Sequence, residues 1–212
     1  MQKPPISARA VSRRQLLRNA LVLGGASAGV GLLGQANAQS EPDEPNEPAD
    51  PNKPGIEGFM APELEVGYWI DADGKPASFS MKESANKWVL LKCFQNWCPG
   101  CHKSGFPTLK AFSDRFHDHP KVAIAGIQTV FEGYSRNTQD AVRELQLRYE
   151  LPIVMGHDPG NPETGTYSST MVNYRTGGTP WLILVNPDGA VVFNGFHVNT
   201  DRLIEFAEEQ VA

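Results

Sequence analysis

The chain has 212 residues, of which 40% are hydrophobic and 20% charged, a balance that suits one globular domain with tails and excludes a disordered chain or an integral membrane protein. Its net charge of −5 disfavours nucleic acid as a partner, because phosphate backbones are bound by basic surfaces. Three cysteines are too few for a disulfide-stapled scaffold, and Cys98 and Cys101 are too close in sequence to join distant segments. We therefore interpret this pair as reactive groups.

An export signal is predicted over residues 1–38. This segment begins with a basic stretch that contains no acid, continues with a weakly apolar run from Ala20 to Leu33, and ends in an Ala-x-Ala site at Ala38. The apolar run is shorter than the roughly 20 residues that a membrane-spanning helix needs. We therefore expect cleavage after Ala38 and no stable membrane span, with an uncleaved anchor as the alternative.

The basic stretch contains Arg13 and Arg14 in a segment that resembles the twin-arginine signal of bacteria, with Leu16 where that signal more often has an aromatic residue. The alternative is an ordinary basic stretch with two adjacent arginines. Cleavage would remove five positive charges and change the net charge from −5 to −10. The predicted location is the periplasm.

An acidic, proline-rich linker is predicted at residues 39–55, where proline recurs at every third position. Such a composition cannot build a core. Since polyproline II has three residues per turn, the prolines would line one face of an extended rod. The segment is either a spacer or a solubilising tail.

Residues 56–212 are predicted to form one α/β domain. A near-continuous apolar run at 87–94 predicts a strand buried on both faces, and apolar residues spaced three and four apart from Phe106 to Phe116 predict the helix that follows it. The next elements are a strand at 122–127, a polar helix at 137–149 and a short apolar stretch at 152–155. This alternation implies parallel strands.

The C-terminal part reads as a hairpin and a helix. Strands are expected at 181–185 and 190–193 around the Asn-Pro-Asp-Gly turn at 186–189. Thr200 is expected to cap a last helix that buries Leu203 and Phe206.

The chemistry concentrates in Trp97-Cys98-Pro99-Gly100-Cys101-His102, where the buried strand ends and the helix begins. A cysteine in the first turn of a helix meets unpaired amides and the positive end of the helix dipole, and both favour its thiolate. Cys98 is therefore expected to be the nucleophile, and Cys101, one turn deeper, the resolving thiol that attacks a mixed disulfide.

From Lys87 to Val211 the sequence resembles the thioredoxin superfamily, and in particular its TlpA-like branch of exported thiol-disulfide oxidoreductases. Its landmarks here are the cysteine motif and Gly178-Thr179-Pro180. The resemblance implies a thioredoxin-like fold: a central mixed sheet flanked by helices, with an extra strand and helix between the cysteine pair and the proline. It also implies that Pro180 is cis and faces the cysteines, that Thr179 pairs with an extended substrate, and that Trp97 shields the pair.

Three residues depart from the pattern of that family. Lys92 stands where the family usually has Asp or Asn. Pro107 lies one residue further along than the usual helix proline, which predicts a bulge or register change near Gly105. Trp181 replaces a small polar residue after the cis-proline, so we expect a narrower or more apolar groove beside the sulfurs.

Lys92 is a candidate for tuning the cysteine pair. On a strand of period two it shares a face with Leu90 and Phe94, so its stem should be buried behind the cysteine helix. An ammonium close to Cys98 would stabilise the thiolate and make the disulfide a better oxidant. Alternatively, Lys92 reaches solvent or pairs with a carboxylate.

Other interpretations of the motif are weaker. Cys98-x-x-Cys101-His102 also matches a c-type haem attachment site, but a haem needs a helical apolar pocket and a further ligand. A peroxiredoxin would have Thr or Ser where the chain has Gln95, and copper-delivery proteins of similar fold separate their cysteines by three residues. Zinc would want four ligands, and the remaining histidines are expected on the surface or in loops.

The sequence thus predicts dithiol-disulfide exchange between the pair Cys98 and Cys101 and protein substrates, with no metal or organic cofactor. An unidentified redox partner would recharge the pair. Cys93, in mid-strand, is expected to be an inert buried thiol. The alternative from another class is a binding protein or chaperone that uses the groove without turnover.

Overall fold

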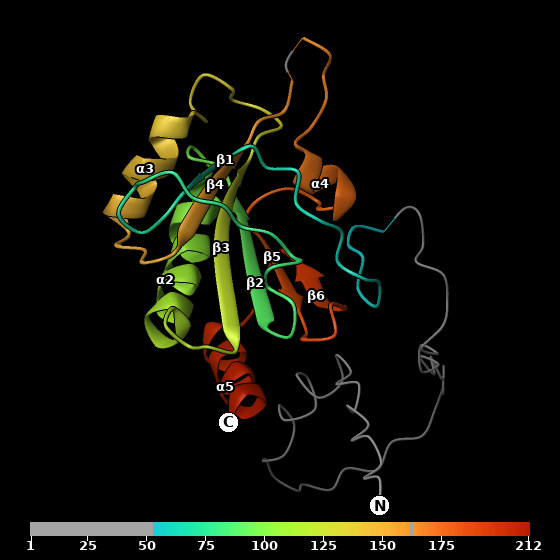
Figure 1. Cartoon of the computed structure of the whole chain (residues 1–212). Helices are drawn as coiled ribbons and strands as arrows, with labels where there is room; N and C mark the ends of the chain where they lie inside the picture. The colour runs from blue at the N-terminus through green and yellow to red at the C-terminus, as the bar shows by residue number, and fades with distance from the viewer. Residues whose placement is uncertain (1–52, 162) are drawn as a thin grey trace, which may run out of the picture. The chain divides into compact units, whose positions relative to one another are not determined.

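The computed structural model describes residues 53–161 and 163–212, so the predicted signal and residues 39–52 of the predicted linker lie outside the described part. A single six-stranded sheet in the order β1-β4-β3-β2-β5-β6 forms the centre of this part (Figure 1). No helix in residues 53–161 and 163–212 is both long and apolar enough to cross a membrane.

Three parallel strands make the middle of the sheet: β2 (Trp88–Phe94), β3 (Val122–Thr129) and β4 (Val154–Asp158). Parallel neighbours need a crossover, and here the crossovers contain α2 (Phe106–Phe116) and α3 (Gln139–Arg148). The predicted parallel pairing is confirmed, and the carboxyl ends of all three strands meet at one edge of the sheet.

The remaining strands are antiparallel. β5 (Trp181–Val185) pairs with β2, β6 (Val191–Gly195) pairs with β5, and β1 (Tyr68–Ile70) pairs with β4. The predicted hairpin is therefore present. The last helix is α5 (Thr200–Val211), and a short helix, α4 (Ser169–Asn173), precedes β5.

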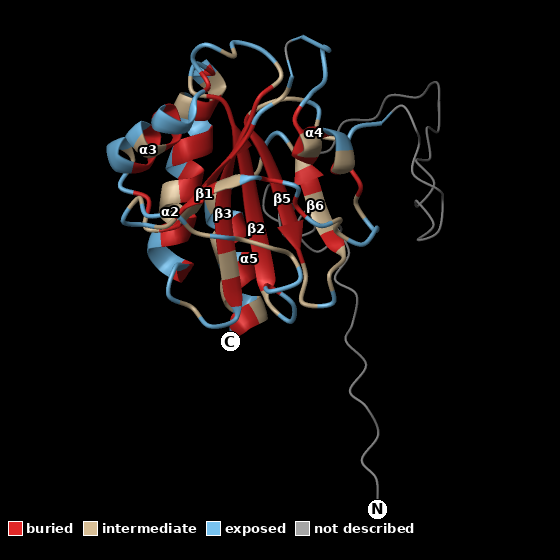
Figure 2. Cartoon of the chain, turned by 45° about the horizontal axis from the view of Figure 1, so that its top comes forward, coloured by how far each residue is buried: buried red, intermediate tan, exposed pale blue. Residues whose placement is uncertain are grey.

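Both faces of the sheet are buried, as Figure 2 shows for the central strands. On β2, Leu90, Lys92 and Phe94 alternate with Val89, Leu91 and Cys93, so the two sets point to opposite faces. The second set joins a cluster to which Ile56, Leu64, Trp69 and Tyr174 also belong. On the first face, Phe94 packs on Phe106 of the cysteine helix, with ring centroids 5.0 Å apart.

Several element boundaries differ from the predicted ones. Asn199, not Thr200, caps α5, because its side chain accepts a hydrogen bond from the backbone N–H of Arg202. The Thr200 hydroxyl instead hydrogen-bonds the hydroxyl of Thr108 in α2 at 2.9 Å. The short apolar stretch at 152–155 overlaps β4, which begins at Val154 and runs on to Asp158.

The start of the cysteine helix is irregular. Residues 99 and 100 are already helical, Cys101–Gly105 form a π-helical turn, and α2 continues from Phe106. The irregularity predicted near Gly105 from the position of Pro107 is therefore confirmed. A π turn contains one extra residue, and such turns are frequent at functional sites.

Candidate active site

Cys98 lies just beyond the carboxyl end of β2, directly before the first helical residue. Its sulfur accepts a hydrogen bond from the backbone N–H of Cys101 at 3.3 Å, the arrangement of a side chain that caps a helix N-terminus. The sulfur also lies 3.5 Å from the carbonyl oxygen of Thr179. It is therefore held between the helix and the segment before β5.

Cys98 is the most exposed of the three cysteines, at 7% against 0% for both Cys101 and Cys93. Burial raises the pKa of the Cys101 thiol to about 12. Burial likewise raises the pKa of Cys93 to about 12, and its side chain points to the opposite face of the sheet. The predicted burial of Cys93 is confirmed, and only Cys98 offers its sulfur toward the surface.

The peptide bond between Thr179 and Pro180 is cis. The proline ring packs directly on the cysteine helix: a Cβ on Gly100 would lie 3.1 Å from Cδ of Pro180, and a Cβ on Gly105 only 2.9 Å from its Cβ. Glycine at both positions allows the helix to approach the proline this closely. The resemblance implied that Pro180 faces the cysteines, and its ring indeed lies beside Gly100, where a Cβ would also be 3.9 Å from the Cys98 sulfur.

Lys92 is buried, with 3% of its surface exposed, and it lies beneath the π turn. A Cβ on Gly105 would be 3.4 Å from Cε of Lys92. Burial lowers the pKa of Lys92 to about 8, against an opposing effect of the nearby sulfurs, that of Cys101 being the largest. No carboxylate of residues 53–161 or 163–212 lies within ion-pair distance of its ammonium, so the expectation that it reaches solvent or pairs with an acid is wrong.

Trp97 is partly exposed, at 37%, and a buried polar network holds its ring. The indole Nε1 donates to Oε1 of Gln95 at 2.8 Å, and the Nδ2 of Asn137 donates to the same oxygen at 2.9 Å. Gly133, at φ +61°, lies against the ring, since a Cβ there would be 2.6 Å from Nε1. Asn137 also accepts from the backbone N–H of Asn96 at 2.8 Å.

This network ties the loop that follows β3 to the cysteine motif, and sequence reasoning did not find it. We expected Asn137 to begin a helix, but α3 begins at Gln139 and Asn137 lies just before it. The fold brings Asn137 into contact with Gln95 and Asn96, next to the cysteine motif. Gln95 and Asn137 are both polar and both fully or nearly fully buried, but the sequence carries no local pattern that predicts their contact.

His102 is half-buried. One ring nitrogen, Nδ1, lies 2.7 Å from the hydroxyl of Tyr149, and the other, Nε2, lies 2.5 Å from the carbonyl oxygen of Asn96. A carbonyl only accepts, so Nε2 carries a proton and Nδ1 in the neutral ring accepts from Tyr149. Both nitrogens are engaged, which is unsuitable for a haem ligand.

Trp181 does not border the groove as expected. Its side chain is buried on the face of the sheet opposite the cysteines, where Nε1 donates to Oδ1 of Asn194. Phe196 packs edge-on against it at 4.5 Å between centroids and is itself 39% exposed. The Phe196 ring lies against the two glycines before Thr179, since a Cβ would be 3.2 Å from it on Gly177 and 3.4 Å on Gly178.

Within the described ranges, no three or more His, Cys, Asp and Glu side chains are grouped so that they could hold a metal ion. Neither a protein-family model nor a curated protein sequence matches the chain.

Solved structures do match. A thioredoxin-like superfamily protein is 25% identical, with a TM-score of 0.61, over 72% of this chain and 95% of its own. A thiol-disulfide isomerase from Corynebacterium glutamicum is 26% identical, with a TM-score of 0.60, over 76% of this chain and 97% of its own. The thioredoxin domain of a thiol-disulfide oxidoreductase from Bacteroides vulgatus, 21% identical with a TM-score of 0.54 over 74% and 99%, shares the fold.

The predicted thioredoxin-like fold is confirmed by these similarities and by the six-stranded mixed sheet. The similar proteins named as thiol-disulfide enzymes support a redox function for the cysteine pair. Together with the cysteine pair beside Pro180, these findings show that the chain has the thioredoxin-like fold and is similar to thiol-disulfide oxidoreductases of that superfamily.

Proposed function

We propose that the protein exchanges dithiols and disulfides with protein substrates in the bacterial cell envelope, as the TlpA-like branch does. The observation that carries this proposal is the position of the Cys98 sulfur, which is capped by the Cys101 amide and lies 3.5 Å from the Thr179 carbonyl. A nucleophile at a helix N-terminus, next to backbone that an extended peptide can approach, suits attack on a disulfide.

In the reducing direction, the Cys98 thiolate attacks one sulfur of a substrate disulfide and the other sulfur leaves as a thiolate that takes up a proton. The Cys101 thiol then loses its proton and attacks the Cys98 sulfur of the mixed disulfide. This step releases the second substrate thiol and leaves a disulfide between Cys98 and Cys101. In the oxidising direction, the same steps run in reverse, and a separate redox partner recharges the pair.

Resolution requires a proton acceptor for Cys101, because its buried thiol with a pKa of about 12 is protonated at neutral pH. Lys92 lies on the same face of the sheet, and its charge interacts more with Cys101 than with the other two cysteines. With a pKa of about 8, Lys92 is mainly an ammonium at pH 7, but its minor neutral form is able to accept a proton, and that form grows as the pH rises. We assign it this role in addition to its electrostatic effect on the pair.

The location in the envelope rests on the predicted signal at residues 1–38 with its Arg13-Arg14 pair. Fusing residues 1–40 to a reporter that is active only after export tests it. Export that is lost when Arg13 and Arg14 are both replaced by Lys would support the twin-arginine route.

The test of the activity is to trap substrates with Cys101→Ser, which should stall the reaction at the mixed disulfide on Cys98. We expect covalent complexes that dithiothreitol releases and that Cys98→Ser, the matched control, does not form. If the Cys98→Ser variant keeps full cellular function, the chain acts by binding without turnover and the proposed exchange is wrong.

A further inference from the structure

Two hollows adjoin at the edge of the sheet where the parallel strands end. One, of about 810 Å³, lies beside β1, β4 and α4, and the other, of about 470 Å³, lies beside the loop after β3 and the start of α3. They share three lining residues, Gln139, His157 and Pro159. We call the two together the trough, defined by these shared residues.

One residue links the trough to the surroundings of the cysteine site. Asn137 lines the smaller hollow and also belongs to the network that holds the Trp97 ring. β4 is two strands away from β2, and neighbouring strands are about 4.8 Å apart, so the trough begins about 10 Å from the strand that leads to Cys98. An extended peptide, which rises about 3.3 Å per residue, crosses this distance in three or four residues.

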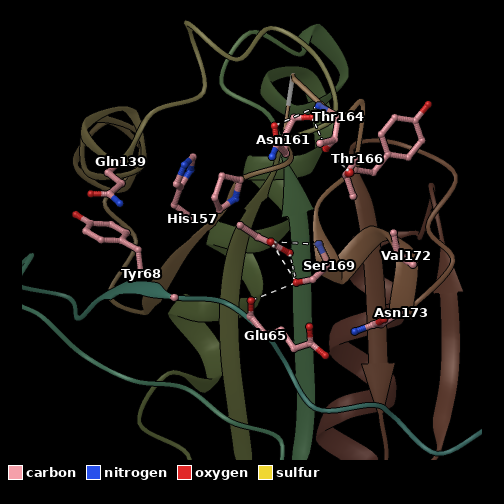
Figure 3. A pocket seen from close by; sticks show the side chains of 14 residues that line it. Glu65, Tyr68, Gln139, His157, Asn161, Thr164, Thr166, Ser169, Val172 and Asn173 are labelled. Atoms are coloured by element: carbon pink, nitrogen blue, oxygen red, sulfur yellow. Dashed lines mark hydrogen bonds between the residues drawn. The ribbon is translucent and has the colours of Figure 1, made fainter.

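The lining suits polypeptide backbone. Figure 3 shows Tyr68, Gln139 and His157 on one side of the larger hollow and Val172 and Asn173 on the other. The side-chain amides of Gln139 and Asn173 can each donate and accept, which allows pairing with a peptide group of any sequence. Val172, with 57% of its surface exposed, and the exposed Tyr167 add apolar contact.

His157 supplies an acceptor. Only 7% of its surface is exposed, and its Nδ1 lies 2.7 Å from Oε1 of Gln128. The carboxamide oxygen accepts, so Nδ1 carries the proton, and Nε2 has no hydrogen-bond partner among the described residues. Burial lowers the pKa of His157, which keeps the ring neutral and Nε2 an acceptor at neutral pH.

The charge of the trough is negative. Glu65 and Asp140 are exposed carboxylates in its lining, and none of the described lining residues is Lys or Arg. Asp158 also lines it, but its carboxylate accepts from the backbone N–H groups of Ser169 and Thr170. Basic side chains in an occupant would therefore be favoured over acidic ones.

We infer that the trough is a second contact site for the substrate, which holds an extended, basic segment of the substrate polypeptide about four residues from its reacting cysteine. The inference rests on the proposed function, because the reacting cysteine is the one that meets Cys98. It assigns to His157, Gln139 and Glu65 a part in substrate selection that is separate from the chemistry of the cysteine pair.

The test compares the rates at which the reduced full chain reduces mixed disulfides of glutathione with cysteine peptides. One peptide has four residues, and two have twelve, with Lys or Glu at the fourth and fifth positions from the cysteine. We expect the long Lys peptide to react at least fivefold faster than the short peptide and at least threefold faster than the long Glu peptide. Equal rates for all three would overturn the inference.

Two arginine variants locate the effect. Val172→Arg places a long cation in the trough, whereas Leu147→Arg does so on α3 outside the trough at a site with a similar exposed fraction, 59%. The preference for the long Lys peptide should disappear in Val172→Arg and persist in Leu147→Arg, and both variants should reduce oxidised glutathione as the parent does. Identical behaviour of the two variants toward the peptides would contradict the inference.

Binding without chemistry separates the two proposals. The long Lys peptide with Ser in place of its cysteine, labelled for fluorescence anisotropy, should bind the parent and Leu147→Arg at least fivefold more tightly than Val172→Arg. If this holds while no disulfide is reduced, the proposed exchange fails and the trough stands as a peptide site. If the parent reduces disulfides but the Ser peptide binds all three proteins equally, the trough inference alone fails.

Discussion

Burying Lys92 without a carboxylate partner opposes folding near neutral pH. The pKa of Lys92 is lowered from the ordinary value of 10.5 to about 8 by burial, a difference that corresponds to about 3 kcal/mol. Below pH 8 the lysine is protonated in both states and this destabilisation is fully present. Between pH 8 and 10.5 the unfolded chain binds the proton more than the folded chain does, so the free energy of unfolding rises with pH.

Replacing Lys92 with Met, which keeps the length and removes the charge, is therefore expected to raise the free energy of unfolding at pH 7 by up to about 3 kcal/mol. This advantage should shrink between pH 8 and 10.5. Urea unfolding at several pH values measures it, with Lys87→Met, at a partly exposed lysine, as the control. A difference that does not change with pH would show that the lysine is not the titrating group.

The same variant tests the role of Lys92 in the reaction. If Lys92 accepts the proton of Cys101, Lys92→Met should slow release of the substrate from the mixed disulfide at pH 7 by at least tenfold, and the remaining rate should rise with pH as hydroxide replaces the amine. Stopped-flow measurement of the two steps separates them. An unchanged release rate with an unchanged pH profile would contradict this role.

Asn137 positions Trp97 without touching the sulfurs. In Asn137→Ala, the buried Oε1 of Gln95 loses one donor and the backbone N–H of Asn96 loses its acceptor, a change that costs about 1–3 kcal/mol. We expect lower stability and a more mobile indole, seen as reduced Trp97 fluorescence anisotropy in a variant without the other tryptophans. Asn137→Asp, which keeps the acceptor for Asn96, should restore part of the stability, and equal losses in both variants would argue against the network.

At the scale of elements, the π turn Cys101–Gly105 and Pro180 are fitted to each other. A methyl group at Gly105 would lie 2.9 Å from Cβ of Pro180, in a rigid ring, and 3.4 Å from Cε of Lys92. Gly105→Ala should therefore lower the free energy of unfolding by about 1–3 kcal/mol and slow the reaction of Cys98 with iodoacetamide. Gly67→Ala, where nothing lies within 4 Å of the added Cβ, is the matched control.

Elements with a strong period were predictable from sequence, and short ones were not. A continuous apolar run predicts β2, and apolar residues spaced three and four apart predict α2. Both patterns are clear because each element buries many residues. β1 has three residues and α4 five, too few to show a period, and their existence depends on Trp69 and Tyr174 packing against the sheet. The cap of α5 was misplaced by one residue because Asn199 and Thr200 are both good caps.

At the scale of the whole molecule, some contacts of the candidate site could be expected from the sequence and others could not. Cys98 and Cys101 form a local motif, whereas the position of Pro180 beside them was expected only from the resemblance to the thioredoxin superfamily. The ties of His102 to Tyr149 and of Gln95 to Asn137 join segments about 40 residues apart or more. Which side chains such loops bring together depends on their path, and no local pattern encodes it.

The core of the domain begins at Ile56, the first residue of the cluster on the face of the sheet opposite the cysteines. A chain that starts at Pro54 keeps every member of that cluster and is expected to melt within about 3 °C of the full chain. A chain that starts at Gly67 loses Ile56, Leu64 and Val66 and should melt many degrees lower. Calorimetry of the two shortened chains measures the difference, and equal melting temperatures would contradict the contribution of residues 56–66.

Cys93 lies in β2, the strand that leads to the reactive site, but it is fully buried and its side chain points to the opposite face of the sheet. The sheet separates its sulfur from those of Cys98 and Cys101, so Cys93 cannot form a disulfide with either of them in the folded chain. A reagent can reach its sulfur only when the strands part, and its labelling in a Cys98→Ser, Cys101→Ser variant then proceeds at a rate set by the opening of the sheet. The labelling rate of Cys93, measured by mass spectrometry under native conditions, therefore reports how fast the sheet opens.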